Sequence, residues 1–282
     1  MNNSKKTEPT ASTELELAVN VEFPIHSQTS TADKLVLLKV RKLLQVLPSY
    51  SYLEIGSYLG GSLTPFLKDP QCARILSIDQ RGSQPADERG LKYNYTGVTH
   101  QTMIDNLNKH NFNASKLETF DGSVSEYNDK DNKFNLMFVD GEHTDWACFR
   151  DFIHGMKLLA DDSIVVFHDS SLIYKSLKII QEYMLASGKI FKFIKINDSE
   201  MSCLFFNNFS SLDLDTVFSS EKNLPKYYAS CENTLFFTNV TTKLTAPLLA
   251  KYLIIKAIPK LLTPLAQKLN QLFKPTHQKT LQ

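Results

Sequence analysis

The sequence lacks the cysteine patterns that mark a disulfide framework or a zinc site. None of its four cysteines belongs to a CxxC pair, and most of them lie in apolar surroundings. It also lacks an excess of one charge, because 31 lysines and arginines stand against 30 aspartates and glutamates. A net charge of +1 gives no electrostatic reason to expect nucleic acid binding. We therefore expect reduced core cysteines and no nucleic acid partner.

The N-terminal residues lack the apolar stretch of a secretory signal. Residues 1–30 are rich in Ser, Thr, Asn and Lys, a composition that favours a disordered or extended segment. The chain of 282 residues, 42% of them hydrophobic, is long enough for one large α/β domain. We expect this domain over residues 31–208 of a cytoplasmic protein.

The ten glycines do not form a GxGxxG dinucleotide fingerprint, but three of them belong to another motif. Residues 52–62 read YLEIGSYLGGS. The apolar run 52–55 is typical of a buried parallel strand. Gly56 and Gly60 then permit a tight turn and a close backbone approach to a ligand, and Ser62 can cap the following helix. This order of strand, turn and helix predicts a ligand-binding corner.

Two acids indicate which ligand this corner binds. Glu54 precedes the first glycine by two positions, where it would repel a phosphate but suit an ammonium group. Asp79 follows the apolar segment 74–78, and an acid at a strand end can accept hydrogen bonds from ribose hydroxyls. The two motifs together resemble the class I S-adenosylmethionine-dependent methyltransferases. A buried glycine turn in some other α/β protein is the alternative.

The resemblance implies a Rossmann-like α/β fold with seven mostly parallel strands and a C-terminal antiparallel hairpin. It also implies S-adenosylmethionine as the cofactor. In this family the polar turn after the third strand meets the adenine. In this chain that turn begins at Asp121. The cofactor-binding residues that the resemblance implies are Glu54, Gly56, Ser57, Gly60, Ser62, Asp79, Asp121 and Ser123.

Four further polar residues follow two other predicted strands. The apolar segment 134–139 delivers Asp140, with His143 just beyond it, and the segment 163–167 ends in His168 and Asp169. Because parallel strands present their carboxyl ends at one edge of a sheet, we expect the four side chains to meet there. Each residue also has a structural explanation, since such an Asp often caps a helix and a lone His often only packs. Four together favour a functional cluster.

The segments VDGEH and FHD resemble the methyltransferases that act on sugar hydroxyls, a branch with macrolide, aminocoumarin and cephalosporin-hydroxylase-like relatives. The likeness covers residues 50–207. It implies that Asp140 and Asp169 hold a magnesium ion and that His143 is the general base. His168, the third candidate metal ligand, stands where some relatives have a second carboxylate, although magnesium prefers oxygen ligands. Manganese, two acids plus waters, or no metal remain open.

We therefore expect an O-methyltransferase that acts on a sugar hydroxyl of a glycan, a glycolipid precursor or a natural product. A metal ion would lower the pKa of the hydroxyl, and His143 would accept its proton. One alternative is an oxygenase with iron held by His143, His168 and a carboxylate. Another is a binding or scaffold protein that keeps the fold without turnover.

The end of the chain has a different composition. Residues 209–242 carry few signals and are assigned to a linker or lid. Residues 243–282 contain no acid, lysines alternate there with apolar residues, and Pro247, Pro259 and Pro264 break the segment. Such a basic, broken, amphipathic tail suits the inner face of an anionic membrane as a peripheral contact. Docking on its own domain or on a second subunit of a homo-oligomer is the competing interpretation.

Overall fold

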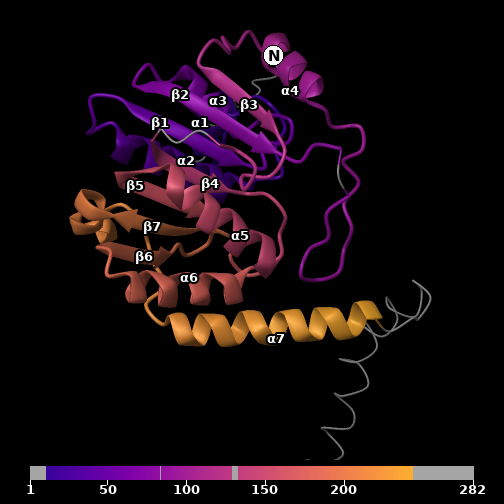
Figure 1. The fold of residues 1–282 in the computed structure, drawn as a ribbon, viewed down its shortest axis with the longest axis vertical. Helices are drawn as coiled ribbons and strands as arrows, with labels where there is room; N and C mark the ends of the chain where they lie inside the picture. Colours follow the sequence, from indigo (N-terminus) through magenta and orange to yellow (C-terminus); the bar gives the residue numbers. More distant parts are fainter. Residues whose placement is uncertain (1–10, 83, 129–132, 244–282) are drawn as a thin grey trace, which may run out of the picture. The chain divides into compact units, whose positions relative to one another are not determined.

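The computed structural model describes residues 11–82, 84–128 and 133–243, which contain a seven-stranded sheet in the order β3-β2-β1-β4-β5-β7-β6 (Figure 1). The first five strands are parallel, and β7 and β6 form an antiparallel hairpin at one edge. This is the predicted fold. The strands are β1 (Tyr50–Ile55), β2 (Cys72–Asp79), β3 (Leu117–Asp121), β4 (Phe134–Val139), β5 (Leu159–Phe167), β6 (Phe191–Lys195) and β7 (Ser202–Phe206).

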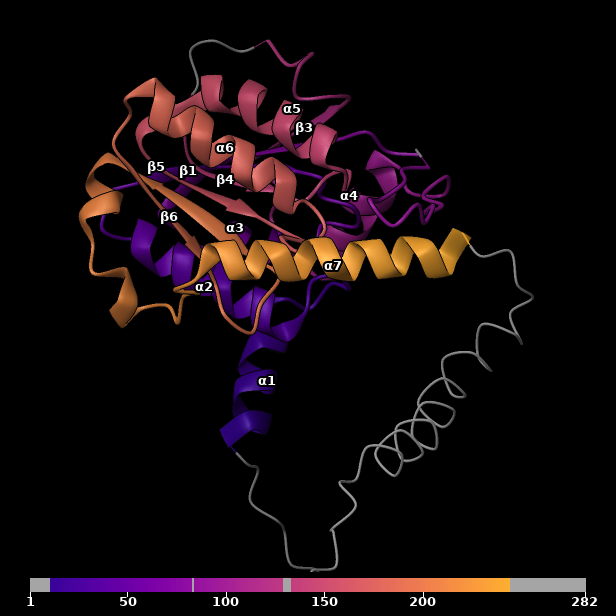
Figure 2. The ribbon, with the colours of Figure 1, turned by 90° about the horizontal axis from the view of Figure 1, so that it is seen from below.

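Helices cover both faces of this sheet, which explains why its central strands are mostly apolar. One face packs against α1 (Ala11–Glu22), α2 (Thr31–Leu44), α3 (Thr64–Lys68) and α4 (His100–Lys109). The other packs against α5 (Asp145–Gly155), α6 (Tyr174–Ser187) and the first part of α7 (Leu224–Lys243). Figure 2 shows α5 and α6 on one side of the sheet and α2 on the other. Three short 3₁₀ helices, η1 (Met156–Leu158), η2 (Asn207–Ser211) and η3 (Leu214–Thr216), complete the described elements.

The strand order reverses at β1, and this reversal fixes the position of the site. β1 pairs with β2 on one side and with β4 on the other. The chain that leaves the carboxyl end of β1 goes to one face of the sheet, and the chain that leaves β4 goes to the opposite face. Open α/β sheets bind ligands in the crevice at such a reversal. The ends of β1, β2, β4 and β5 carry all the predicted site residues except those after β3.

The N-terminal segment differs from the expectation of a disordered or extended chain. Residues 11–22 form α1, and Val19, Phe23 and Ile25 are buried in the core. Phe23 directly follows α1, and its backbone N–H donates to the carbonyl of Val19 at 2.9 Å, so the two side chains lie on the same side of the helix. The segment is mostly polar, so its composition did not indicate these few buried apolar residues. Residues 1–10 lie outside the described residues.

The segment expected to be a linker or lid is mostly packed structure. Phe209, Leu214 and Phe218 are buried beside η2 and η3, and Tyr228 of α7 is buried in the core on the other face. The chain divides into two compact units, residues 1–235 and 236–282, and of the second unit only the part of α7 up to Lys243 is described. Among the described helices, none combines the length and the apolar character needed to cross a bilayer. The predicted membrane-binding or docking tail lies almost entirely outside the described residues.

Candidate active site

Gly56 marks the corner that follows β1, and its role is packing between two chain segments. Its φ is +92°, and a Cβ at this position would lie 2.1 Å from the carbonyl oxygen of Asp140. The backbone after β4 therefore passes directly over Gly56. Gly61 is also crowded, since a Cβ there would lie 2.8 Å from the Cβ of Ser27. The glycines thus bring three chain segments together at the corner, and a ligand approach alone does not explain them.

Glu54 lies beneath this corner and not in the wall of the cavity described below. Its side chain is 0% exposed, and its carboxyl accepts hydrogen bonds from Ser62 Oγ and, at 2.6 Å, from Tyr52 Oη. Ser62 therefore does not cap α3, which begins without a side-chain cap. Burial raises the pKa of Glu54 to about 8, although the two hydrogen bonds oppose this shift. A direct contact between Glu54 and a cofactor ammonium group has no support in this geometry.

The raised pKa of Glu54 predicts a pH-dependent stability. Because the folded state holds the proton that the unfolded chain releases near its ordinary pKa of 4.5, stability falls as the pH rises from about 4.5 to about 8. Glu54→Gln cannot titrate, so it should gain stability relative to wild type over this range. The gain between pH 5.5 and 7.5 should be on the order of 2 kcal/mol. Urea unfolding of both proteins at the two pH values measures it, and a difference that stays constant contradicts the assignment.

Asp79 ends β2 and lines the cavity, where its carboxylate accepts a hydrogen bond of 2.8 Å from the backbone N–H of Tyr58. Burial raises the pKa of Asp79, and the nearby Arg81 opposes the shift. A buried carboxylate of this kind gains from additional donors, and ribose hydroxyls are such donors. Asp79 therefore fits the ribose-binding role that the sequence predicted.

The two residues predicted after β3 lie in different surroundings. Ser123 is buried and lines the cavity, whereas Asp121 does not line it and is about half exposed. Asp121 forms an ion pair with Arg81. Gly60 does not line the cavity either, whereas Ser57 does.

Arg81 is a site residue that the sequence analysis did not single out. Its side chain is 3% exposed and donates hydrogen bonds of 3.0 Å to Ser57 Oγ and to Ser77 Oγ. These contacts place a buried guanidinium against the glycine corner, beside Asp79. The one available signal was its position two residues after a strand-ending acid.

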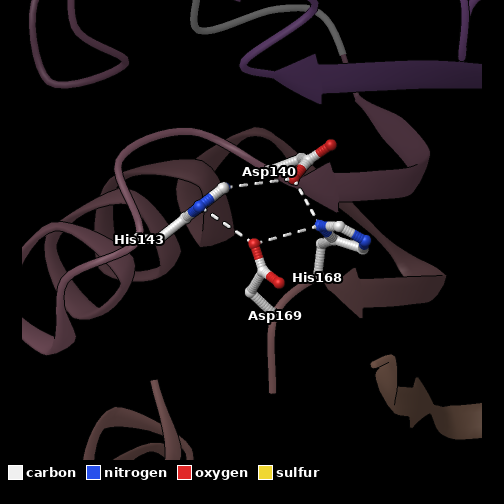
Figure 3. A group of neighbouring side chains, drawn as sticks. All are labelled: Asp140, His143, His168 and Asp169. Carbon is white, nitrogen blue, oxygen red and sulfur yellow. Dashed lines mark ion pairs between the residues drawn. The ribbon is translucent and has the colours of Figure 1, made fainter. Parts of the chain in front are cut away.

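Asp140, His143, His168 and Asp169 converge at the ends of β4 and β5 (Figure 3). Because Val139 pairs with Phe167, the two strands end side by side. Asp169 Oδ2 lies 2.9 Å from His143 Nδ1 and 3.4 Å from His168 Nδ1. Asp140 Oδ1 lies 2.8 Å from His168 Nδ1 and 3.5 Å from His143 Nε2. One ligand atom from each residue falls within 4.8 Å of all the others, so the predicted cluster is present.

The charges of this cluster fit a divalent cation. Burial disfavours the charged form of His143, but hydrogen bonds to Asp140 and Asp169 outweigh it and raise the pKa of His143 to about 9. The same two carboxylates raise the pKa of His168, against its own burial. Two carboxylates thus attract two protons, a charge that one divalent cation can replace. His168 Nδ1 is also buried without a well-aligned hydrogen bond from the described residues, as an unused ligand atom would be.

One cavity of about 780 Å³ joins the glycine corner to the cluster. Cavities of 300 to 1,000 Å³ are typical of small-molecule sites. Sequence patterns did not indicate the part of its wall that the segment before α2 forms, because that segment carries no apolar periodicity. The loop after β2 forms another part of the wall. The cavity residues from these two segments and from the glycine corner include His26, Ser27, Gln28, Thr29, Tyr58, Arg89, Tyr93 and Tyr95.

The loop after β2 is fixed against the turn that carries His143. The backbone N–H of Glu88 donates to the His143 carbonyl at 3.2 Å, and its carboxylate accepts from the N–H of Asp145 at 2.7 Å. Asp87 is buried, and its carboxylate binds the side chains of Arg89 and Tyr93. These contacts hold Tyr93 and Arg89 over the cavity.

The comparisons with known proteins agree with this geometry. Residues 53–170 match the family described as "Methyltransferase domain". Uncharacterized protein R132 of Acanthamoeba polyphaga mimivirus is 26% identical over 141 residues, which cover 50% of this chain and 58% of that protein. The chain therefore spans less than two thirds of this relative's length.

Solved structures of methyltransferases are similar to this chain. The O-methyltransferase NovP is 11% identical with a TM-score of 0.52, over 71% of this chain and 100% of NovP. The O-methyltransferase TomG from Streptomyces achromogenes, solved with S-adenosylmethionine, is 14% identical with a TM-score of 0.47, over 73% of this chain and 93% of TomG. As the sequence predicted, residues 53–170 match a methyltransferase domain, and the seven-stranded sheet shares its fold with the O-methyltransferase NovP.

Proposed function

We propose that this chain transfers a methyl group from S-adenosylmethionine to a hydroxyl group of a sugar-containing acceptor, with the help of a divalent cation. The observation that carries the proposal is the single cavity that joins Asp79 at the glycine corner to the cluster of Asp140, His143, His168 and Asp169. A cofactor and an acceptor must lie side by side for methyl transfer, and this cavity has a distinct set of polar groups for each.

The cofactor half of the cavity consists of Asp79, Ser57 and Ser123, with Arg81 packed beside them. Asp79 would accept hydrogen bonds from the ribose, and Ser123 would border the adenine. The bound cofactor supplies a methyl group on a sulfonium that is its own leaving group. The protein's remaining task is to align the acceptor oxygen with it.

The acceptor half supplies the base and the cation site. The contact of 2.9 Å between His143 Nδ1 and Asp169 fixes the ring, so that Nε2 can take the hydroxyl proton. Asp140 and Asp169, with His168 Nδ1 as a third ligand, would hold the cation. A cation bound there lowers the pKa of a hydroxyl group. A histidine ligand suits manganese or another transition ion better than magnesium.

The tyrosines of the cavity favour a ring-shaped acceptor. The rings of Tyr93 and Tyr95 stack with an interplanar angle of 10°, and the ring of Tyr58 lies 5.3 Å from that of Tyr95. Such rings offer flat apolar faces beside hydroxyl groups. The C–H face of a sugar ring can pack on these faces while its hydroxyls meet the polar groups.

A methyl-transfer screen tests the proposal. The purified protein is incubated with methyl-labelled S-adenosylmethionine and either nucleotide sugars or glycolipid extracts, with and without EDTA. We expect label in a sugar-containing product, loss of the signal with EDTA, and recovery on addition of Mn²⁺. Label that appears only in sugar-free products contradicts the acceptor class, and full activity in a demonstrably metal-free sample contradicts the cation.

The cofactor half makes a separate prediction. Asp79→Ala should weaken binding of S-adenosylhomocysteine by about 10- to 100-fold, the usual effect of losing hydrogen bonds to a charged group. Asp105→Ala is the matched control, because Asp105 is an exposed acid on α4 outside the cavity. Calorimetry measures the affinity of wild type, Asp79→Ala and Asp105→Ala for S-adenosylhomocysteine. Equal affinities would remove Asp79 from the cofactor site.

The cluster also supports a second candidate, a metal-dependent oxygenase. His143, His168 and Asp169 form a set of two histidines and one carboxylate, which is the ligand set of many non-haem iron oxygenases. Iron-dependent consumption of a 2-oxo acid, without methyl transfer, would favour this candidate over the first.

A further inference from the structure

Asp33 is a buried acid that the proposed reaction does not use directly. It lies in the first turn of α2, and only 2% of the residue is exposed. In the chain it precedes the matched methyltransferase domain. Its Oδ2 lies 3.4 Å from Nε2 of His168, within hydrogen-bond distance. His168 is itself only 7% exposed, so this contact joins two buried side chains that can carry charge.

The carboxylate of Asp33 is fixed by contacts from two other directions. Its Oδ1 accepts hydrogen bonds from Ser199 Oγ at 2.6 Å and from the backbone N–H of Glu200 at 2.8 Å. Its Oδ2 accepts a hydrogen bond of 2.5 Å from Oγ of Ser30, the N-cap residue of α2. Both residues 199 and 200 belong to the turn between β6 and β7, so Asp33 ties this turn to the start of α2.

The same turn is tied to the end of β5. The backbone N–H of Ser170 donates to the Glu200 carbonyl at 2.9 Å, next to Asp169. Asp33, His168 and Asp169 therefore belong to one connected set of contacts. Because Asp33 is held at both oxygens, it can hold the imidazole of His168 in one orientation.

We propose that Asp33 is a positioning residue that makes His168 a metal ligand through Nδ1. A carboxylate oxygen accepts the proton of Nε2, and in a neutral imidazole Nδ1 then keeps its lone pair. That atom faces the space between Asp140 Oδ1, at 2.8 Å, and Asp169 Oδ2, at 3.4 Å. The inference rests on the cation site of the proposed function, and it adds a residue from outside the matched domain to that site.

Metal affinity is the first test, with Zn²⁺ as the probe because it binds both imidazole and carboxylate ligands. Asp33→Asn keeps the shape of the side chain and an oxygen for Ser199 and Glu200, but an amide in place of Oδ2 cannot accept the Nε2 proton. We expect it to weaken Zn²⁺ binding by about 10- to 100-fold, the usual effect of losing such a partner. Ser199→Ala is the matched control, because it removes a contact of Asp33 that does not involve His168. Its affinity should stay close to that of wild type.

The second test is the protonation pattern of His168, read by ¹⁵N NMR of the Zn²⁺-loaded wild-type protein. We expect a metal-bound Nδ1 and a protonated Nε2, which purely structural support by Asp33 would not determine. Zinc on Nε2 overturns the inference even if no variant folds, and so does equal Zn²⁺ affinity of wild type and a folded Asp33→Asn. A wild-type protein that binds no divalent cation instead overturns the cation site of the proposed function, and the role of Asp33 with it. The proposed methyl transfer would then be tested separately, by the screen with labelled S-adenosylmethionine.

Discussion

His143→Gln should lower methyl-transfer turnover by about 100-fold or more, the usual contribution of a positioned general base. Asp169 holds Nδ1 of His143 at 2.9 Å, so Nε2 is the atom available to accept the acceptor proton. A glutamine of similar size can make hydrogen bonds in this place but cannot take up a proton at neutral pH. Affinity for S-adenosylhomocysteine should change little, because the cofactor half of the cavity is untouched. Turnover at saturating substrate and calorimetry measure the two effects.

His154→Gln is the matched control for this prediction. His154 lies near the end of α5, the helix that follows His143, and it does not line the cavity. The same chemical change there should leave turnover near the wild-type value. Wild-type turnover in His143→Gln would mean that another group accepts the proton.

Gly56→Ala should destabilise the protein by about 4 kcal/mol or more, a size that is exceptional for one methyl group. A Cβ at this position would lie 2.1 Å from the carbonyl oxygen of Asp140 and 2.5 Å from its carbonyl carbon, and neither can move without displacing the end of β4. The φ of +92° adds strain for any side chain. We expect a fall in Tm of about 10 °C or the loss of folded protein. Thermal unfolding followed by circular dichroism measures it.

Gly90→Ala separates the two causes. Gly90 also has a positive φ, of +74°, but a Cβ there would meet no atom within 4 Å. It should therefore show only the backbone cost of about 1 to 2 kcal/mol. If both variants lose the same stability, the close approach of residue 140 to Gly56 is not the dominant effect.

The cluster of Asp140, His143, His168 and Asp169 was predictable because each residue follows a strand that the sequence marks clearly. The strands 134–139 and 163–167 are apolar runs of the right length, and parallel neighbours must end at the same edge. Once these strands were assigned, the geometry of the sheet determined the rest. The same reasoning placed Asp79 beside the glycine corner.

Other features of the site were not predictable, because they depend on contacts between segments far apart in the chain. Arg81 enters the cavity wall and Ser62 binds Glu54 where a helix cap was expected. Gly56 is required by a carbonyl more than 80 positions away in sequence, and Asp33 reaches His168 across 135 positions. No periodicity or motif in the sequence carries this information.

The sequence by itself determined the class of fold, the positions of the main strands along the chain and the polar residues that follow them. Local patterns suffice for these, since hydrophobic runs, turn residues and strand-ending acids act over a few positions. The tertiary structure alone decided which groups share a hydrogen bond, which acid is buried behind the wall and which segments close the cavity. These depend on differences of about a few tenths of an ångström in the distances between side chains, and the packing of the whole domain sets such distances.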